Sequence, residues 1–286
     1  MSDLTAENEP VASPQERWAS LSQAERDTAY DNNKAVANSA DLVSARNRAA
    51  EAYRASHAGH LDIPYGPGER LKFDLYPAED PAAPCLVFIH GGYWQRNSRE
   101  FFGHLAAGAA AIGWSVAMPS YNLAPAATVT QIVAEIGQSL DWLAEYGAGH
   151  GIAGPILLSG WSAGAQLTAL NLAHPAVVGG LAISGVFDLG PIRDTYLNAA
   201  LKLTDAEIKA LSPLKLPVVM KPLVIAYGSA ELPALIADSQ GLHELRAAAN
   251  APSALMPLEG ADHFTVLDEL LQPDGKLLSL MGMIVR

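Results

Sequence analysis

The chain has 286 residues, half of them hydrophobic, so it is long enough to bury the core of one large domain or two small ones. Its formal net charge of -12 disfavours nucleic acid and anionic membranes as partners, because both need clustered cations, and a small molecule is the expected partner. The single cysteine, Cys85, excludes an internal disulfide and a cysteine-based zinc site, which fits a cytoplasmic protein.

The N-terminal segment is polar. Residues 1–14 contain two prolines and predict an unstructured tail. The stretch Met1 to Val11 lacks the basic start and apolar run of a secretory signal, and no apolar stretch of the chain is long enough to cross a membrane. Residues 15–58 are rich in Ala, Glu, Arg and Asn and favour an arm of one or two short helices laid against the main domain.

Strands and helices alternate through the remaining chain. Leu71–Tyr76 alternates apolar with polar residues, which is typical of a half-buried edge strand. Short apolar runs predict further strands at Cys85–Ile89, Val116–Met118, Ile156–Leu158, Val177–Ile183, Pro222–Tyr227 and Ala254–Leu258. Helical spacing and capping signals predict helices at Asn97–Ile112, Val129–Tyr146, Ala163–Ala173 and Leu235–Ala249, the first through a capping box of Asn97 and Glu100. The pattern indicates the α/β class, with a mostly parallel central sheet flanked by helices.

One segment interrupts this alternation, at about residues 187–216. It carries its own capping box, formed by Thr204 and Glu207, and so contains at least one helix. We expect it to be a small cap over the functional site, with residues 15–286 forming one domain.

The sequence Gly160-Trp161-Ser162-Ala163-Gly164 follows an apolar strand and precedes a helix of small residues. A sharp turn from strand to helix holds a serine in a strained conformation that exposes its oxygen, and the flanking glycines let the chain segments pack closely. Ser162 is therefore the candidate nucleophile. The alternative is a serine in an ordinary tight turn.

A second glycine-rich loop, His90-Gly91-Gly92-Tyr93-Trp94, follows the strand at Cys85–Ile89. Acyl transfer passes through an oxyanion that needs preorganised backbone N–H donors, and glycines allow close approach. We expect the loop from Gly91 through Gly92 to Tyr93, together with the amide of Ala163, to form an oxyanion hole. The alternative is a plain turn in which the glycines relieve strain; His90 itself is interpreted as structural.

The general base is expected near the end of the chain, after the last strand, where His263 lies. The acid that orients it is expected after the penultimate strand. Glu231 fits this place best, and Asp238 and Asp188 are the alternatives.

Aromatic residues lie in or beside these loops and suit a flat aryl substrate, although such residues also pack caps. Besides Tyr93, the candidates for substrate binding are Trp94, Tyr121, Trp161, Phe187, Tyr196 and Phe264. No metal site is expected, because His57 and His60 have no cluster of carboxylates or cysteines beside them.

With these motifs the sequence resembles the arylformamidases, or kynurenine formamidases, of the esterase and lipase branch of α/β-hydrolases. The stretches that carry the resemblance span about residues 60–265 and are His90–Trp94, Gly160–Gly164, Ser184–Leu189, Leu211–Leu214 and Asp262–Phe264. The resemblance implies the α/β-hydrolase fold, with Ser162 as nucleophile, His263 as base and an acid at Glu231, where the family often has aspartate.

The resemblance also implies an activity: hydrolysis of an aryl formamide such as N-formylkynurenine to kynurenine and formate, through an acyl-enzyme and without a cofactor. The alternative within enzymes is a carboxylesterase or amidase for another aromatic ester, amide or carbamate. The alternative outside enzymes is a ligand-binding receptor of this fold without catalysis. A homodimer is one oligomeric state compatible with the sequence.

Overall fold

The computed structural model describes residues 14–57 and 60–285, and its first elements are helices. They are α1 (Pro14–Ser20), α2 (Gln23–Thr28), α3 (Asn32–Ala35) and the long α4 (Ser39–Ser56). The prediction of one or two short helices was therefore wrong for the described part of the arm. The expected tail at residues 1–14 lies outside the described residues, except for Pro14, which begins α1.

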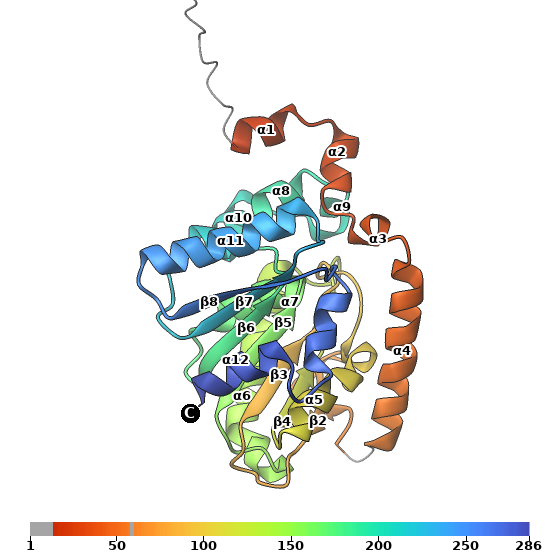
Figure 1. The fold of residues 1–286 in the computed structure, drawn as a ribbon, viewed down its shortest axis with the longest axis vertical. Helices are drawn as coiled ribbons and strands as arrows, with labels where there is room; N and C mark the ends of the chain where they lie inside the picture. Colours follow the sequence, from red (N-terminus) through yellow and green to blue (C-terminus); the bar gives the residue numbers. More distant parts are fainter. Residues whose placement is uncertain (1–13, 58–59, 286) are drawn as a thin grey trace, which may run out of the picture.

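The centre of the molecule is an eight-stranded sheet in the order β1-β2-β4-β3-β5-β6-β7-β8 (Figure 1). The strands from β3 onward run parallel, and the pairs β1–β2 and β2–β4 are antiparallel. The strands are β1 (Ile63–Pro64), β2 (Lys72–Tyr76), β3 (Cys85–Ile89), β4 (Ser115–Pro119), β5 (Ile156–Trp161), β6 (Val177–Ile183), β7 (Leu223–Gly228) and β8 (Ser253–Leu258). The prediction of a mostly parallel sheet is confirmed.

Helices cover both faces of the sheet, and alternate side chains of one strand enter two different cores. In β3, Cys85, Val87 and Ile89 belong to one core, and Leu86 and Phe88 belong to the other. The first core includes side chains of α6 (Val129–Tyr146), α7 (Ala163–Asn171) and α11 (Pro233–Ala248). The second includes side chains of α5 (Ala106–Ala111), η5 (Thr265–Leu270) and α12 (Lys276–Ile284). Burial on both faces explains why the central strands are apolar runs.

The strand β2 differs from the half-buried edge strand that its alternating sequence predicts. It lies between β1 and β4, and Asp74 on its polar face is fully buried. Two arginines compensate this carboxylate: Arg54 from α4 at 2.6 Å and Arg99 at 2.9 Å. The polar face is buried because α4 covers it and supplies a counter-charge.

The single helix expected at Asn97–Ile112 is also wrong. The segment forms two 3-10 turns, η1 (Arg99–Phe101) and η2 (Gly103–Leu105), before α5. Asn97 does not act as a cap, because its backbone is left-handed (φ 71°) and its side chain donates to Gly91 O at 3.1 Å. By contrast, the capping box of Thr204 and Glu207 is confirmed at the start of α10 (Asp205–Leu211).

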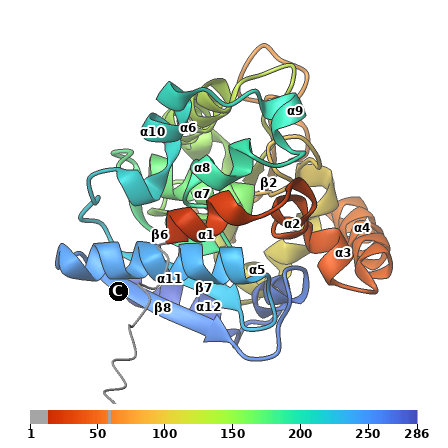
Figure 2. The same ribbon diagram turned by 90° about the horizontal axis from the view of Figure 1, so that it is seen from above.

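The N-terminal helices lie against the insertion between β6 and β7. This insertion holds α8 (Leu189–Arg193), α9 (Asn198–Leu201), α10 and η4 (Pro213–Lys215). Trp18 Nε1 donates to Asp194 Oδ2 at 3.0 Å, and Tyr196 N donates to Asp27 Oδ1 at 2.8 Å. Seen from above, α1 and α2 lie over this part of the molecule, and α4 lies at its side (Figure 2). In the part of the chain that the structure describes, no helix has the length and apolar character to cross a membrane.

Candidate active site

Ser162 stands at the turn from β5 into α7, with a backbone that only a constrained loop can impose (φ 59°, ψ -118°). The two flanking glycines permit the turn. A Cβ on Gly160 would lie 2.2 Å from Gly164 O, and a Cβ on Gly164 would lie 2.1 Å from Ile89 O. The strained serine and the close packing are those that the sequence motif predicts.

His263 and Glu231 are joined by a hydrogen bond between His263 Nδ1 and Glu231 Oε2 at 2.8 Å. The other carboxylate oxygen, Oε1, accepts the Gly228 N–H at 2.7 Å and the Ser184 hydroxyl at 2.5 Å. Both side chains are buried. A carboxylate that accepts from three donors keeps a fixed position. It therefore fixes the orientation of the imidazole ring and leaves Nε2 for another partner. Among the described residues His263 bonds to Glu231 and not to the Ser162 hydroxyl, and catalytic contacts of this kind often form only when substrate binds.

The two alternative acids lie elsewhere. Asp238 accepts the backbone N–H groups of Phe187 at 2.6 Å and Asp188 at 3.1 Å, so it stabilises the start of the insertion. Burial raises the pKa of Asp238 to about 7. Asp188 caps α8 and pairs with Lys215 at 2.6 Å. Of the three candidates, Glu231 is the one that contacts His263.

The loop after β3 turns through three residues of positive φ: Gly92 (123°), Tyr93 (50°) and Trp94 (58°). Gly92 and Tyr93 line the same cavity as Ser162, and within the described chain their backbone N–H groups have no acceptor. Gly91 packs closely against the turn at Ser162, because a Cβ there would lie 2.6 Å from Trp161 O. Ala163 is the first residue of α7, where backbone N–H groups are free of helical partners.

Ser162 and His263 open into one cavity of about 200 Å³. The insertion contributes Tyr196, and the residues next to Ser162 and His263 in the chain contribute Trp161 and Phe264. These three residues lie where the sequence predicts substrate-binding aromatic residues.

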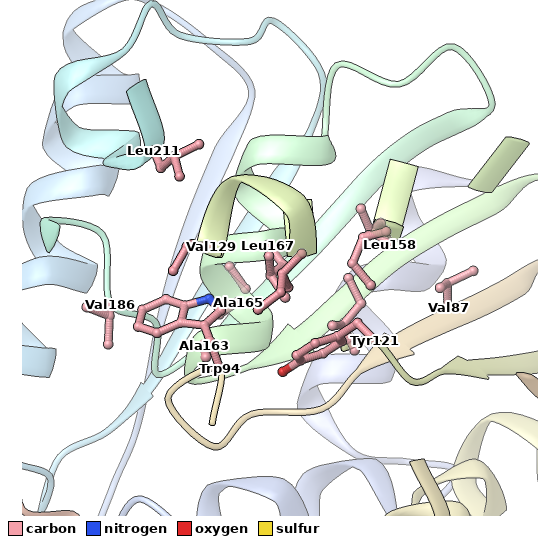
Figure 3. Packing of buried hydrophobic residues seen from close by; sticks show 14 of the residues in the cluster. Val87, Trp94, Tyr121, Val129, Leu158, Ala163, Ala165, Leu167, Val186 and Leu211 are labelled. Carbon is pink, nitrogen blue, oxygen red and sulfur yellow. The ribbon is translucent and has the colours of Figure 1, made fainter. Parts of the chain in front are cut away.

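The other three aromatic candidates are buried in the core and do not line this cavity. The Trp94 side chain points from the loop after β3 into the core, where its indole donates to Gln166 Oε1 at 3.2 Å, and Figure 3 shows it among Val129, Ala165 and Val186. The hydroxyl of Tyr121 donates to His90 O at 2.8 Å. Phe187 is likewise fully buried, because its ring packs over Gly185. Proximity to a loop in the sequence did not distinguish aromatic rings that enter the core from aromatic rings that line the cavity.

His90 is structural, as the sequence analysis expects. It is buried and its ring stacks on Tyr121 with centroids 4.3 Å apart. Burial lowers the pKa of His90 to about 3, so the ring is neutral near pH 7.

The N-terminal arm forms one wall of the cavity, which the sequence analysis did not foresee. Asp31, Asn32, Val43 and Arg46 line it. The hydroxyl of Tyr93 connects this wall to the oxyanion loop, because it donates to Tyr30 O at 2.8 Å and accepts from Asn32 Nδ2 at 3.0 Å. No local pattern marks these residues, since their position depends on how the arm docks.

The sequence and the fold were compared with those of known proteins. A family model described as BD-FAE matches residues 73–176. A kynurenine formamidase of Danio rerio is 28% identical over 287 residues, which cover 92% of this chain and 97% of that protein. A crystal structure of a candidate thioesterase from a Silicibacter species is 32% identical, with a TM-score of 0.80, and the match covers 90% of this chain and 99% of that one.

A more distant solved structure has the same fold. A thermophilic esterase of Thermogutta terrifontis with bound butyrate has a TM-score of 0.64 at 22% identity, over 79% of this chain and 93% of that one. At this identity the likeness concerns the fold alone.

Proposed function

Since this chain belongs to the kynurenine formamidase-like α/β-hydrolases, we propose that it is a serine-dependent arylformamidase, which cleaves an aryl formamide such as N-formylkynurenine to the arylamine and formate. The family membership confirms the α/β-hydrolase fold expected from the sequence and makes the chain a hydrolase. The observation that carries the proposed mechanism is the His263–Glu231 hydrogen bond beside the strained Ser162, with Ser162 and His263 lining one cavity.

In the first step, His263 Nε2 takes the proton of the Ser162 hydroxyl while Oγ bonds to the formyl carbon. The carbonyl π electrons move to oxygen and form a tetrahedral oxyanion. The backbone N–H groups of Gly92, Tyr93 and Ala163 stabilise its charge. The Glu231 carboxylate stabilises the imidazolium, which keeps its Nδ1 proton.

In the second step the oxyanion collapses, the C–N bond breaks and His263 gives its Nε2 proton to the departing arylamine. The formyl group is then an ester of Ser162. A water molecule loses a proton to His263, attacks the formyl carbon and releases formate, and the same proton returns to Ser162. The only proton carrier required is His263.

The aromatic residues of the cavity support an aryl substrate. Trp161, Tyr196 and Phe264 line a cavity of about 200 Å³ that Ser162 also lines. Such rings bind a flat ring by stacking and apolar contact. We further propose that residues 15–286 are one domain, in which the insertion at about 187–216 is a cap over the active site and residues 15–58 are an N-terminal arm.

The test is Ser162→Ala, with Ser159→Ala as a matched control. Ser159 lies on the same strand, is buried, and its hydroxyl has no partner among the described residues. Loss of Ser162 should lower kcat for N-formylkynurenine by about 10³-fold or more, whereas Ser159→Ala should leave kcat within about threefold. If Ser162→Ala stayed within about tenfold of the parent, the mechanism would be wrong.

The competing activity is hydrolysis of esters or thioesters, because the same groups perform it and a relative of 32% identity is a candidate thioesterase. The comparison to make is kcat/KM for N-formylkynurenine, a nitrophenyl ester, an aryl thioester and an aryl carbamate. A formamidase should have its highest kcat/KM for the formamide.

A further inference from the structure

Arg46 projects from α4 to the wall of the catalytic cavity. The same residue also lines a second, adjoining cavity of about 220 Å³, so it lies at the boundary between the two. Its guanidinium carbon lies 4.4 Å above the centre of the Phe102 ring, which is fully buried. The ring fixes one face of the guanidinium and excludes water from it.

The charge of Arg46 has no counter-ion in the described part of the chain. Its side-chain hydrogen bonds there go to the neutral Asn47, with Oδ1 at 3.2 Å from Nε and 3.0 Å from Nη2. Burial lowers the pKa of the guanidinium to about 10. Two other arginines differ in this respect, because the half-buried Arg54 and the buried Arg99 both pair with the carboxylate of Asp74.

The acidic residues of the two cavities do not neutralise Arg46. Asp31 in the catalytic cavity accepts the backbone N–H of Lys34 at 3.1 Å as the cap of α3, and it forms no ion pair with Arg46. Asp268 in the second cavity likewise forms none within the described residues. The other arginine of the catalytic cavity, Arg96, is exposed, so water screens its charge.

We propose that Arg46 is a specificity-determining residue that binds a carboxylate on the leaving-group side of the substrate. The inference rests on the proposed function, because it places the anion on the aryl part of the formamide that Ser162 attacks. A partly dehydrated guanidinium gains more from an anion than an exposed one, since water competes less for both charges. Its planar donors suit a carboxylate, and the neighbouring ring prevents it from turning away.

The substrate class is therefore an aryl formamide that carries a carboxylate. The formyl end lies at Ser162, the aryl ring lies among the aromatic residues of the cavity, and the carboxylate reaches the α4 wall. Because Arg46 is not placed at the reacting atoms, it should act on binding and on orientation, and the chemistry at the formyl carbon should be the same for neutral substrates.

The experiment compares Arg46→Met with the parent enzyme on N-formylkynurenine and on its carboxamide, which has the same scissile bond but no carboxylate. The parent should prefer the carboxylate by about 10- to 100-fold in kcat/KM. Arg46→Met should lose this preference mainly through KM, so that kcat/KM falls much more for N-formylkynurenine than for the carboxamide. Arg46→Lys should keep part of the preference.

The matched control is Arg48→Met, which removes the same charge from the same helix. Arg48 is exposed, donates to Ser44 Oγ at 2.7 Å and does not line the catalytic cavity. Arg48→Met should leave unchanged the ratio of kcat/KM for N-formylkynurenine to kcat/KM for its carboxamide. The proposal is overturned if the parent enzyme has no preference, or if Arg46→Met lowers both substrates equally, since the latter is the effect of a purely structural arginine.

A failure of the proposed function is distinguishable from a failure of this inference. If neither formamide turns over, the arylformamidase proposal fails. The charge comparison is then made with 3-acetoxybenzoate and 3-acetoxybenzamide, two aryl acetates that differ in the same way. If Arg46→Met keeps the parent's ratio of kcat/KM for the benzoate to kcat/KM for the benzamide, the role of Arg46 is overturned. If the variant loses the preference for the benzoate, the role is supported.

Discussion

The indole Nε1 of Trp161 donates a hydrogen bond to the backbone oxygen of His263 at 2.8 Å, and the two rings lie 4.8 Å apart. Trp161 immediately precedes Ser162 in the chain. The bond therefore connects the strand that leads to the proposed nucleophile, Ser162, to the loop that carries the proposed base, His263. It holds two segments about a hundred residues apart in sequence at a fixed separation, which proton transfer between their side chains requires.

Trp161→Phe keeps an aromatic ring but removes the donor to His263. We expect kcat to fall by about tenfold with little change in KM, because the base loses an anchor while the cavity keeps its ring. Trp18→Phe is the control, since it removes an indole hydrogen bond to Asp194, outside the cavity. Equal kinetics for the two variants would show that the Trp161 bond does not position His263.

Glu231→Gln removes the charge that stabilises the imidazolium and leaves the side chain nearly the same size. The expected loss in kcat is about 10³- to 10⁴-fold, as for the removal of a triad carboxylate charge. Asp238→Asn, at the alternative acid, should change kcat by less than about threefold because Asp238 bonds to backbone at the insertion. Steady-state kinetics of both variants decide the assignment, and the reverse ranking would move the acid to Asp238.

Sequence patterns predicted the central sheet and the chain order of the candidate site because these depend on local signals. The apolar run at Cys85–Ile89 and the helix at Val129–Tyr146 match β3 and α6 without adjustment. The turn at Ser162 is strained, as its two glycines indicate.

Features that depend on contacts between distant segments were not predicted. Ser184 lies in a stretch that carries the family resemblance, but no local pattern indicates that its hydroxyl donates to Glu231 from the end of β6. Trp94 and Trp161 both lie beside glycine loops, but Trp94 enters the core and Trp161 lines the cavity. Arg46 belongs to a helix whose composition resembles a solvated one, and it lines a cavity only because α4 packs beside Phe102.

Tyr93→Phe removes the hydroxyl that connects the oxyanion loop to the arm. We expect KM to rise by about three- to tenfold, and the amides of α3 to exchange hydrogen faster, because the wall formed by Asn32 loses its bond to the loop. Hydrogen exchange and steady-state kinetics measure the two effects. Tyr65→Phe is the control, since its hydroxyl donates to Ser120 O elsewhere in the core. Unchanged exchange in α3 would mean that the arm docks independently of Tyr93.

His90 predicts a pH dependence of stability. Its folded pKa lies at about 3, well below the ordinary value of 6.5, because burial disfavours the charged ring. Between these two pH values the unfolded chain binds a proton at this position and the native chain does not, so the free energy of unfolding falls as the pH falls. The slope is at most about 1.4 kcal/mol per pH unit for one proton.

The variant that tests this effect is His90→Phe, which keeps a ring between Tyr121 and Phe102. It removes the titrating group, including Nε2, which is buried without a hydrogen-bond partner among the described residues. Urea unfolding of both proteins at pH 7.5, 6.5 and 5.0 gives the difference in their free energies of unfolding, in which the other titrating groups largely cancel. From pH 6.5 to 5.0 the parent should lose about 1 to 2 kcal/mol relative to the variant. Parallel curves would mean that His90 does not carry the proton-linked loss of stability, and that the acid sensitivity of the fold arises at other groups.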